Sequence, residues 1–374
     1  MFFKDIVGQE ELKNRLIKDI RAGRIPHAQL FVGPMGHGGF PIALAYAQYL
    51  NCTNPSNLDS CGVCPSCVKY KKLVHPDLHF VFPILKSSKP KCELCDDVLP
   101  LWREFVTANP YLSFDSWIRA LNIGNGQPQI YSKESDELIR KLGLKASEGG
   151  YKVVLIWLPE KMNIACANKL LKLFEEPPVK TVFLLIAEET ERMLPTVLSR
   201  TQQLFIPPIL EADLLQNLIE VHKVNAEQSS KIVQQAGGNL SFALEMLKIE
   251  HESEEFFKLF VKLMRLAYLR SVKEIKKWSE EVASWGREKQ KSFLQFSQRM
   301  VRESFIFNFN QPELNYLTQM EQGFASNFSP FINERNVTSI SRELSEAERH
   351  IEQNVNAKMV FFDFSLKMIV LLRQ

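Results

Sequence analysis

The first two hundred residues contain five short apolar runs, each with the length and composition of a buried strand. The runs are AQLFV at 28–32, LHFVF at 78–82, YKVVLIW at 151–157, TVFLLIA at 181–187 and QQLFI at 202–206. Their apolar residues follow one another without the alternation of a half-exposed strand, so we expect both faces of the sheet to be covered. Because helical patterns separate the runs, the chain predicts a doubly wound α/β domain, a parallel sheet flanked by helices.

One of these helices has clear ends in the sequence. Asn163 is placed to cap its first turn, and Pro177 and Pro178 end it. The apolar positions between them recur at helical spacing and are Ala167, Leu170, Leu171 and Phe174. The segment therefore predicts a helix between two of the parallel strands.

After Pro207 and Pro208 the pattern changes, because the apolar residues recur every three or four positions and no further strand is indicated. A charged run, IEHESEE, interrupts this helical pattern near 250. The segment 84–128 is irregular and punctuated by proline, asparagine and glycine, and we expect an insertion there. The sequence thus predicts an α/β domain at 1–207, a helical segment at 208–250 and an all-α domain at 251–374.

Composition narrows the class of protein. The 374 residues are 45% apolar and 24% charged, which is typical of a globular protein with two or three domains. No apolar run reaches the roughly 18 residues that span a bilayer, and the acidic residues in MFFKDIVGQEELK argue against a signal peptide. We therefore expect a cytoplasmic protein with no membrane partner. A net charge of +3 is too small to indicate nucleic-acid binding by electrostatics alone.

Four cysteines lie close together in the run CTNPSNLDSCGVCPSC, at positions Cys52, Cys61, Cys64 and Cys67. Without a secretion signal disulfides are disfavoured, and four thiolates at this spacing most simply enclose one tetrahedral Zn²⁺. An iron–sulfur cluster is the alternative, although the Cys-Pro that completes the ferredoxin run is missing. Because all four ligands would be cysteines, no position is left for water and we expect a structural zinc site.

The other cysteines carry weaker signals. Cys92 and Cys95 cannot close a metal site alone, and they form either a pair in a surface loop, which we favour, or a substitute pair of ligands. Cys166 stands beside Ala165 and Ala167 on a helical pattern, where a small buried residue is expected.

The stretch GPMGHGGF at 33–40 lies between a predicted strand and an alanine-rich helical pattern, which is the context of a phosphate-binding loop. Gly33, Gly36 and Gly38 supply its flexible positions. In a working loop the last two residues are Lys and Ser or Thr, because the ammonium reaches the β- and γ-phosphates and the hydroxyl holds Mg²⁺. Here they are Gly39 and Phe40, so we expect neither a bound nucleotide cofactor nor ATP hydrolysis.

Several blocks of the sequence resemble the bacterial clamp-loader AAA+ subunits. The opening, FKDIVGQEELKNRLIKDIRAGRIPHAQLFVGPMGHG, carries Val7-Gly8-Gln9 in the adenine-side motif. Further blocks are ANKLLKLFEEPP at 167–178, LPTVLSRTQ at 194–202, GGNLSFAL at 237–244, NVNAK at 354–358 and HPDLH at 75–79, just after the cysteines. The resemblance implies an AAA+ α/β domain with an inserted zinc module at about 52–67, a helical lid at 208–250 and an all-α C-terminal collar domain at 251–374 for oligomerisation.

The resemblance also implies which positions would carry the residues for ATP hydrolysis, and most of those residues are missing from this sequence. The strand that should end in two acidic residues ends in Trp157 and Leu158, and Ser241 replaces the arginine of the lid motif. Ser199-Arg200 matches the Ser-Arg-Cys motif, with Thr201 in place of its cysteine. The arginine of that motif resembles an arginine finger for the ATP of the neighbouring subunit. The resemblance therefore implies no catalytic residue in cis, and Arg200 acting in trans.

This combination is similar to the delta-prime class of subunits of the DNA polymerase III clamp loader. It implies gamma/tau-type ATPase subunits and delta-type subunits as partners in a hetero-oligomeric ring. The sliding clamp and primer-template DNA would be reached through that complex. Two alternatives stay open: an active AAA+ ATPase in which Glu160 stands in for a lost carboxylate, and a zinc module that binds nucleic acid directly, although it lacks interleaved aromatics for base stacking.

Overall fold

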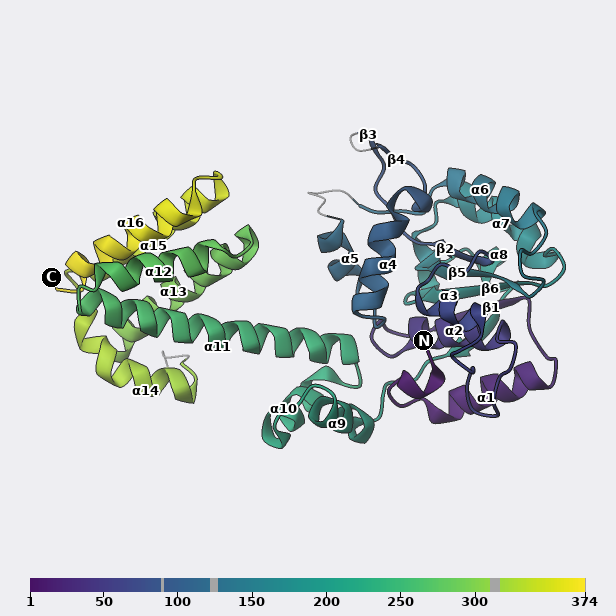
Figure 1. The fold of residues 1–374 in the computed structure, drawn as a ribbon, viewed down its shortest axis with the longest axis horizontal. Coiled ribbons are helices and arrows are strands. Elements are labelled where there is room, and N and C mark those ends of the chain that lie inside the picture. The colour runs from purple at the N-terminus through teal and green to yellow at the C-terminus, as the bar shows by residue number, and fades with distance from the viewer. Residues whose placement is uncertain (89–90, 122–126, 310–316, 374) are drawn as a thin grey trace. The chain divides into compact units, whose positions relative to one another are not determined.

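The computed structural model describes residues 1–88, 91–121, 127–309 and 317–373, and it divides into two compact units, Met1–Met246 and Leu247–Gln374. Figure 1 follows the chain through both. The N-terminal unit is built on the strands β1 (Ala28–Val32), β2 (Leu78–Val81), β5 (Lys152–Trp157), β6 (Thr181–Ala187) and β7 (Gln202–Phe205). They form one sheet in the order β2-β5-β6-β1-β7, and every neighbouring pair is parallel. The predicted parallel sheet is confirmed, with each strand within two residues of its predicted run.

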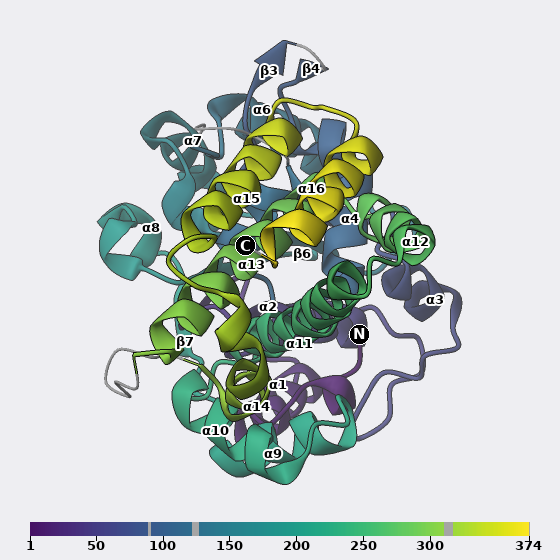
Figure 2. The same ribbon diagram turned by 90° about the vertical axis from the view of Figure 1, so that its left-hand side faces the viewer.

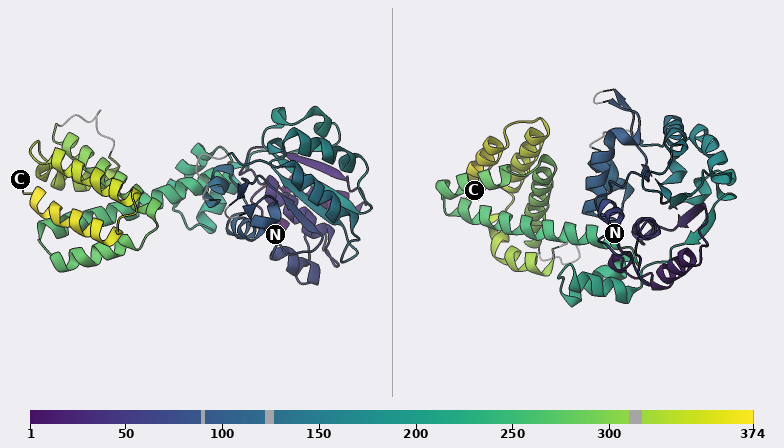
Figure 3. Two further views of the ribbon diagram at one scale, coloured as in Figure 1. Left: turned by 90° about the horizontal axis from the view of Figure 1, so that it is seen from above. Right: turned by 45° about the vertical axis from the view of Figure 1, so that its right-hand side comes forward.

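Helices cover both faces of this sheet, which explains the unbroken apolar runs. Besides the two helices of the segment between β2 and β5, the α/β part contains α1 (Glu10–Arg21), α2 (Gly39–Leu50), α3 (Pro65–Lys71), α6 (Ser132–Gly143), α7 (Ile164–Glu175) and α8 (Pro195–Leu198). In Figure 1 α1 and α2 lie on one side of the sheet and α6 and α7 on the other, and Figure 3 shows the strands between them. All residues of β1, β5 and β6 are buried as a result.

The helix predicted between two strands is α7. The Asn163 side chain caps it by accepting a hydrogen bond from the backbone N–H of Cys166 at 2.8 Å, and the helix ends at Glu175 before the two prolines. Leu170 and Phe174 are fully buried in one core cluster with strand residues such as Leu185. The capping residue, the apolar spacing and the two prolines therefore mark the start, the buried face and the end of this helix, as the sequence predicted.

The segment between β2 and β5 is more regular than the sequence indicated. It contains β3 (Ser87–Ser88), β4 (Lys91–Cys92), α4 (Leu99–Ala108) and α5 (Phe114–Ala120), while residues 89–90 and 122–126 of the predicted insertion lie outside the described part. Trp102 of α4 and Trp117 of α5 are fully buried. Trp102 stacks on Phe82 with ring centroids 4.1 Å apart, and the indole N–H of Trp117 donates to the carbonyl of Pro83 at 2.8 Å. These contacts anchor both helices at the end of β2.

The described residues that follow β7 contain helices and no strand, as predicted. They are α9 (Glu211–Glu220), α10 (Ala226–Ala236), α11 (Leu240–Tyr268), α12 (Val272–Ala283), α13 (Arg287–Phe307), α14 (Gln319–Phe328), α15 (Val337–Glu352) and α16 (Ala357–Leu371). Short 3₁₀ helices lie at Phe3–Asp5, Cys95–Val98, Pro159–Lys161, Thr190–Arg192 and Ser329–Phe331. The charged run near 250 does not break α11, which continues through it.

The C-terminal unit has its own aromatic core. Phe260 of α11 contacts Phe328 of α14 edge to face, and the indole N–H of Trp278 in α12 donates to the carbonyl of Leu259 at 3.1 Å. Phe361 of α16 packs against Trp278, and α15 and α16 run side by side (Figure 2). None of the helices in the described ranges is both long and apolar enough to cross a membrane.

Candidate functional site

The glycine-rich stretch 33–40 forms the turn between β1 and α2, as its motif predicts. Gly36 and Gly38 adopt φ angles of 87° and 102°, which favour glycine, and Gly38 is the N-cap of α2. A Cβ atom on Gly33 would lie 2.7 Å from the carbonyl oxygen of Ile206, so only glycine fits beside the end of β7. The backbone of a phosphate cradle at a helix N-terminus is therefore present.

Apolar side chains pack beside this cradle. Phe40 is 4% exposed and its ring meets that of Trp102 edge to face, with centroids 5.8 Å apart. Trp157, at the end of β5, is 1% exposed and lies 5.2 Å from Trp102 between centroids. The cavity that remains, bordered also by Leu158, has a volume of about 20 Å³. That is about the space of one water molecule.

Two further segments close around the loop. The backbone N–H of Leu240 donates to the carbonyl of Gly36 at 3.1 Å, and a Cβ on Gly36 would overlap the side chain of Asn239. The Ser241 hydroxyl donates to the carbonyl of Tyr111 at 3.1 Å, and the Tyr111 hydroxyl accepts from the backbone N–H of Val7 at 2.8 Å. Thus the start of α11 and the adenine-side segment are tied together through a tyrosine of the insertion.

Gln9 completes this closure. Its side-chain amide donates to the carbonyls of His37 at 3.1 Å and Pro207 at 2.6 Å. Gln9 itself has a φ angle of 63°, in the left-handed region that few residues with side chains adopt. The glutamine therefore joins the loop to the chain that leaves β7.

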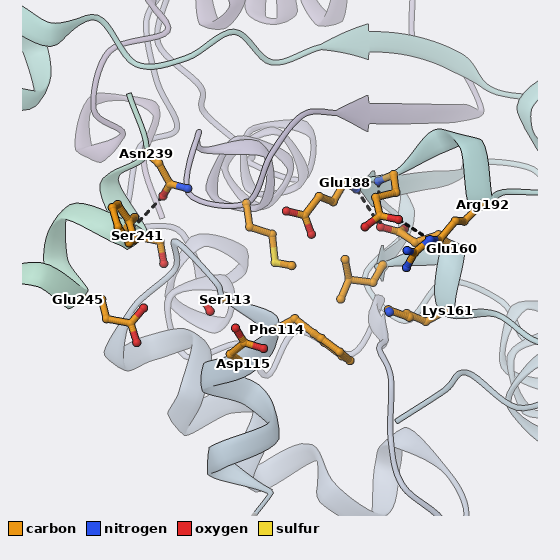
Figure 4. A pocket seen from close by; sticks show the side chains of 14 residues that line it. Ser113, Phe114, Asp115, Glu160, Lys161, Glu188, Arg192, Asn239, Ser241 and Glu245 are labelled. Carbon is orange, nitrogen blue, oxygen red and sulfur yellow. Dashed lines mark hydrogen bonds and ion pairs between the residues drawn. The ribbon is translucent and has the colours of Figure 1, made fainter. Parts of the chain in front are cut away.

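Beside the loop lies a larger pocket of about 330 Å³, drawn in Figure 4. It is lined by Met35, Ser113, Phe114, Asp115, Leu158, Glu160, Lys161, Glu188, Glu189, Arg192, Asn239, Ser241, Phe242 and Glu245. Five of these residues are carboxylic acids and two are cations, so the pocket carries an excess of negative charge. Such a field opposes the binding of an anionic triphosphate.

Glu160, the carboxylate that the sequence offered as a replacement for the lost acidic pair, is engaged through one oxygen, while its Oε2 is buried without a hydrogen-bond partner among the described residues. One of its oxygens accepts hydrogen bonds from the backbone N–H groups of Glu188 at 2.9 Å and Glu189 at 3.3 Å. Burial raises the pKa of the Glu160 carboxyl, and burial also raises the pKa of Glu188. Both shifts have the same cause, since burial disfavours the charged form of a carboxyl.

The four clustered cysteines come together at the N-terminus of α3. Their sulfur atoms all lie within 4.8 Å of one another, and the part of the chain that the structure describes contains no other such group of histidines, cysteines or acids. Tetrahedral zinc with bonds of about 2.3 Å separates sulfurs by about 3.8 Å, which this cluster can accommodate. The residues fit a Cys₄ metal site, and their positions are Cys52, Cys61, Cys64 and Cys67.

Backbone amides prepare these thiols for metal binding. The N–H groups of Cys61, Cys64 and Cys67 donate to the sulfurs of Cys52, Cys61 and Cys64 at 3.2, 3.4 and 3.4 Å. Burial raises the pKa of the Cys64 thiol, but hydrogen bonds from Cys67 and Thr53 outweigh it and hold the value at about 6. Hydrogen bonds from Cys64 and Val63 also lower the pKa of Cys61. These two shifts favour the thiolate, the form that coordinates metals, whereas burial raises the pKa of Cys52 and of Cys67.

Arg200 lies just after α8, in the segment that joins β6 to β7. It lines neither of the two cavities described beside the glycine-rich loop. Its side chain is 31% exposed. The guanidinium donates to Glu175 through Nε at 2.5 Å and to the carbonyl of Thr196 through Nη1 at 2.9 Å, with the Ser199 hydroxyl 3.4 Å away. The structure therefore presents a partly exposed arginine held by its own chain.

The other cysteines are buried. Cys95 is 1% exposed and Cys92 is 6% exposed, so the expectation of a surface loop pair is wrong. The reason is that Cys95 begins a 3₁₀ helix, where its thiol donates to the carbonyl of Phe82 and its N–H donates to the Glu134 carboxylate at 2.9 Å. Cys166 is fully buried, as expected.

The sequence analysis does not identify Trp102 and Tyr111, two residues of the 84–128 segment that contact the glycine-rich loop and its neighbours. A signal was present, because Trp102, Phe105 and Val106 recur at three- and four-residue spacing directly after Pro100. Pro100 stands in the first turn of α4, where proline is favoured, so it marks a helix start and not a loop.

Comparison with known proteins gives consistent matches. Residues 8–209 match the protein-family model described as DNA polymerase III, delta subunit. DNA polymerase III subunit gamma/tau of Mycobacterium bovis is 29% identical over 240 residues, which cover 63% of this chain and 34% of the relative. DNA polymerase III subunit delta' of Pseudomonas aeruginosa is 31% identical over 181 residues, covering 48% and 43%. The delta' subunit of Bacillus subtilis is 26% identical over 264 residues, covering 70% and 66%. The chain spans about a third of the length of the first curated relatives that it matches.

Proposed function

The chain belongs to the DNA polymerase III delta subunit family of clamp-loader proteins, and from this premise we propose that it is a delta-prime-type subunit. In this proposal the chain hydrolyses no ATP itself and supplies Arg200 in trans to a neighbouring ATPase subunit. The reaction served is the loading of a sliding clamp onto primed DNA during replication. The observation that carries the proposal is the packing of Phe40, Trp102 and Trp157 against one another beside the glycine-rich loop, with a cavity of only about 20 Å³ left there.

The charge at the loop supports the same proposal. Phosphoryl transfer depends on cations and metal ions that stabilise the charge on the γ-phosphoryl oxygens. At this loop Gly39 offers no ammonium, Ser241 offers no guanidinium, and the pocket beside it is rich in carboxylates. An ATP site with this balance of charge would destabilise the transferred group.

The position of Arg200 supports a role toward a neighbour. It follows a helix whose Val197 is fully buried, so its backbone is fixed, while its guanidinium is partly exposed. An arginine finger needs both properties, because it must reach the phosphate of another subunit from a rigid base. Ser199 lies beside it and contributes a hydroxyl at 3.4 Å.

The remaining parts of the chain would serve assembly. We assign 208–250 to a helical lid that closes on the glycine-rich loop, and 251–374 to a collar domain that joins gamma/tau-type and delta-type subunits in one ring. The four cysteines would hold a structural Zn²⁺, because a site of four thiolates leaves no position for a reacting water. The clamp and the DNA would then be contacted through the assembled complex.

A second candidate is an active AAA+ ATPase, which the gamma/tau matches favour. Nucleotide binding separates the two: a fluorescent ATP analogue added to the isolated chain is expected to give no binding at millimolar Mg²⁺. The decisive experiment for the proposed function is reconstitution with gamma/tau-type and delta-type subunits, in which an Arg200→Ala chain should assemble normally and lower the clamp- and DNA-stimulated ATPase. Saturable nucleotide binding with turnover by the isolated chain would favour the second candidate.

A further inference from the structure

Two residues from neighbouring helices meet at the proposed finger. Glu175 is the last residue of α7, directly after the fully buried Phe174, and Arg200 follows α8, whose Val197 is 1% exposed. The backbone N–H of Arg200 donates to the carbonyl of Val197 at 3.1 Å. Both backbones are therefore anchored in the same core cluster, and only the two side chains are free to change conformation.

Each nitrogen of the Arg200 guanidinium contacts a group of its own chain. Nε donates to a carboxylate oxygen of Glu175, and Nη2 contacts the same oxygen, while Nη1 donates to the carbonyl of Thr196. All three nitrogens thus have partners within the subunit. The Glu175 carboxylate also cancels much of the positive charge that an arginine finger contributes to its neighbour.

A carboxylate and a phosphate engage the same N–H groups of a guanidinium, because both offer paired anionic oxygens to its planar fork. The γ-phosphate of a neighbour's ATP would therefore have to displace Glu175. ADP lacks that phosphate, so the ion pair would close again after hydrolysis and phosphate release.

We propose that Glu175 is a latch that holds Arg200 inactive until the γ-phosphate of a neighbouring subunit's ATP displaces it. This inference rests on the proposed function of Arg200 in trans. The pair is partly exposed, with side-chain exposures of 31% for Arg200 and 48% for Glu175, so opening it is easily reversible. A weak latch suits a step that must occur in every loading cycle.

The test uses the reconstituted complex and four versions of this chain: wild type, Glu175→Gln, Arg200→Ala and the double variant. Glu175→Gln removes the carboxylate charge and keeps the shape of the side chain. It should raise the clamp- and DNA-stimulated ATPase by about two- to five-fold, the range that release of an exposed ion pair allows. In the Arg200→Ala background the same change should have no effect, because the latch has nothing to hold.

The matched control is Glu176→Gln, the adjacent exposed carboxylate, for which the described residues provide no side-chain ion pair. It should leave the ATPase unchanged, and all variants should melt at the same temperature as wild type. If Arg200→Ala is as active as wild type, the proposed function itself fails. If Arg200→Ala is defective but Glu175→Gln is unchanged or slower, the latch is refuted and the proposed function stands.

Discussion

The ring of Phe40, in the glycine-rich loop, and the indole of Trp102, in the insertion, meet edge to face with centroids 5.8 Å apart. Phe40 stands where a phosphate-binding loop carries the hydroxyl that holds Mg²⁺. Trp102 belongs to a helix that the insertion adds to the α/β domain. The contact shows that the insertion and the altered loop form one packed unit.

Trp102→Ala should destabilise the N-terminal unit by about 3–5 kcal/mol, because it removes a fully buried indole from a cluster of six aromatic neighbours. Trp102→Phe should cost only about 1–2 kcal/mol, since the indole N–H makes no hydrogen bond among the described residues. Urea unfolding followed by circular dichroism measures both. Phe205→Ala, at a side chain that is 71% exposed, is the control and should change the free energy of unfolding by less than about 0.5 kcal/mol. Equal losses for Trp102→Ala and Phe205→Ala would contradict the importance of this cluster.

The isolated chain should release no phosphate from ATP above background, and Gly39→Lys should not create activity. The added ammonium would meet a cavity of about 20 Å³ that is bordered by Phe40, Trp157 and Leu158, so neither the triphosphate nor Mg²⁺ gains a place. A phosphate-release assay at saturating ATP measures the rate. ATP hydrolysis by the Gly39→Lys variant would mean that the aromatic side chains move to admit the nucleotide.

The purified chain should carry about one zinc, bound by the four clustered cysteines. Replacing Cys61 and Cys64 by serine together should abolish the metal, because two ligands cannot retain it. Elemental analysis of protein prepared without added zinc gives the ratio. Cys166→Ala is the control, since Cys166 lies in the core cluster of the sheet and outside the cysteine group, and it should keep the full metal content. Full zinc in the double serine variant would exclude this ligand set.

Arg200→Ala should leave folding, zinc content and assembly unchanged, because a partly exposed cation contributes little to stability. The stimulated ATPase and the rate of clamp loading should fall, by less than the roughly 10³- to 10⁵-fold of a fully acting finger, since the proposed ring holds several ATP sites and Arg200 would serve one of them. Arg200→Lys should be nearly as defective, because a point charge does not replace the planar fork. If the complex with the alanine variant loaded clamps at the wild-type rate, Arg200 would have no role as an arginine finger and the chain would act only as a scaffold.

Burial, with a smaller contribution from Lys141, lowers the pKa of His79 to about 4, below its usual value of about 6.5. The unfolded chain therefore binds a proton at this residue more readily than the folded chain does. Its contribution to stability is fully present above about pH 6.5 and is lost as the pH falls toward 4. His79→Gln should reduce the loss of stability between pH 7 and pH 4.5 by roughly 1–3 kcal/mol. Urea unfolding at pH 7 and at pH 4.5 measures the free energy of unfolding at each pH. The control is His27→Gln, at an exposed histidine, which should lose as much stability between the two pH values as the wild type does.

The sheet could be predicted from the sequence because its strands are buried on both faces and so leave unbroken apolar runs. The helix after Asn163 was equally clear, since its cap, its apolar spacing and its proline stop all lie within sixteen residues, from Asn163 to Pro178. α4 was missed for the opposite reason. Prolines and polar residues surround it and indicate irregular structure, although Pro100 stands in the first turn of the helix.

The candidate site also has one part that the sequence predicts and one part that it does not. The absence of the loop lysine and hydroxyl is visible at Gly39 and Phe40, and the spacing of the four cysteines indicates a metal site by itself. The packing of Trp102 against Phe40 is not predictable from the sequence, because Trp102 comes from a distant segment whose helix the pattern does not indicate. The contact between Arg200 and Glu175 is hidden for a similar reason, since it depends on how the ends of α7 and α8 pack.

The burial of Phe40 also bears on how such a chain can evolve. A return to nucleotide chemistry requires a hydroxyl at Phe40 and an acidic residue at Trp157, and each change alone would place a polar group or a void inside an aromatic cluster. Each single change would therefore lower stability. Selection that preserves a folded chain would then disfavour polar substitutions at both positions, whatever the chain's role.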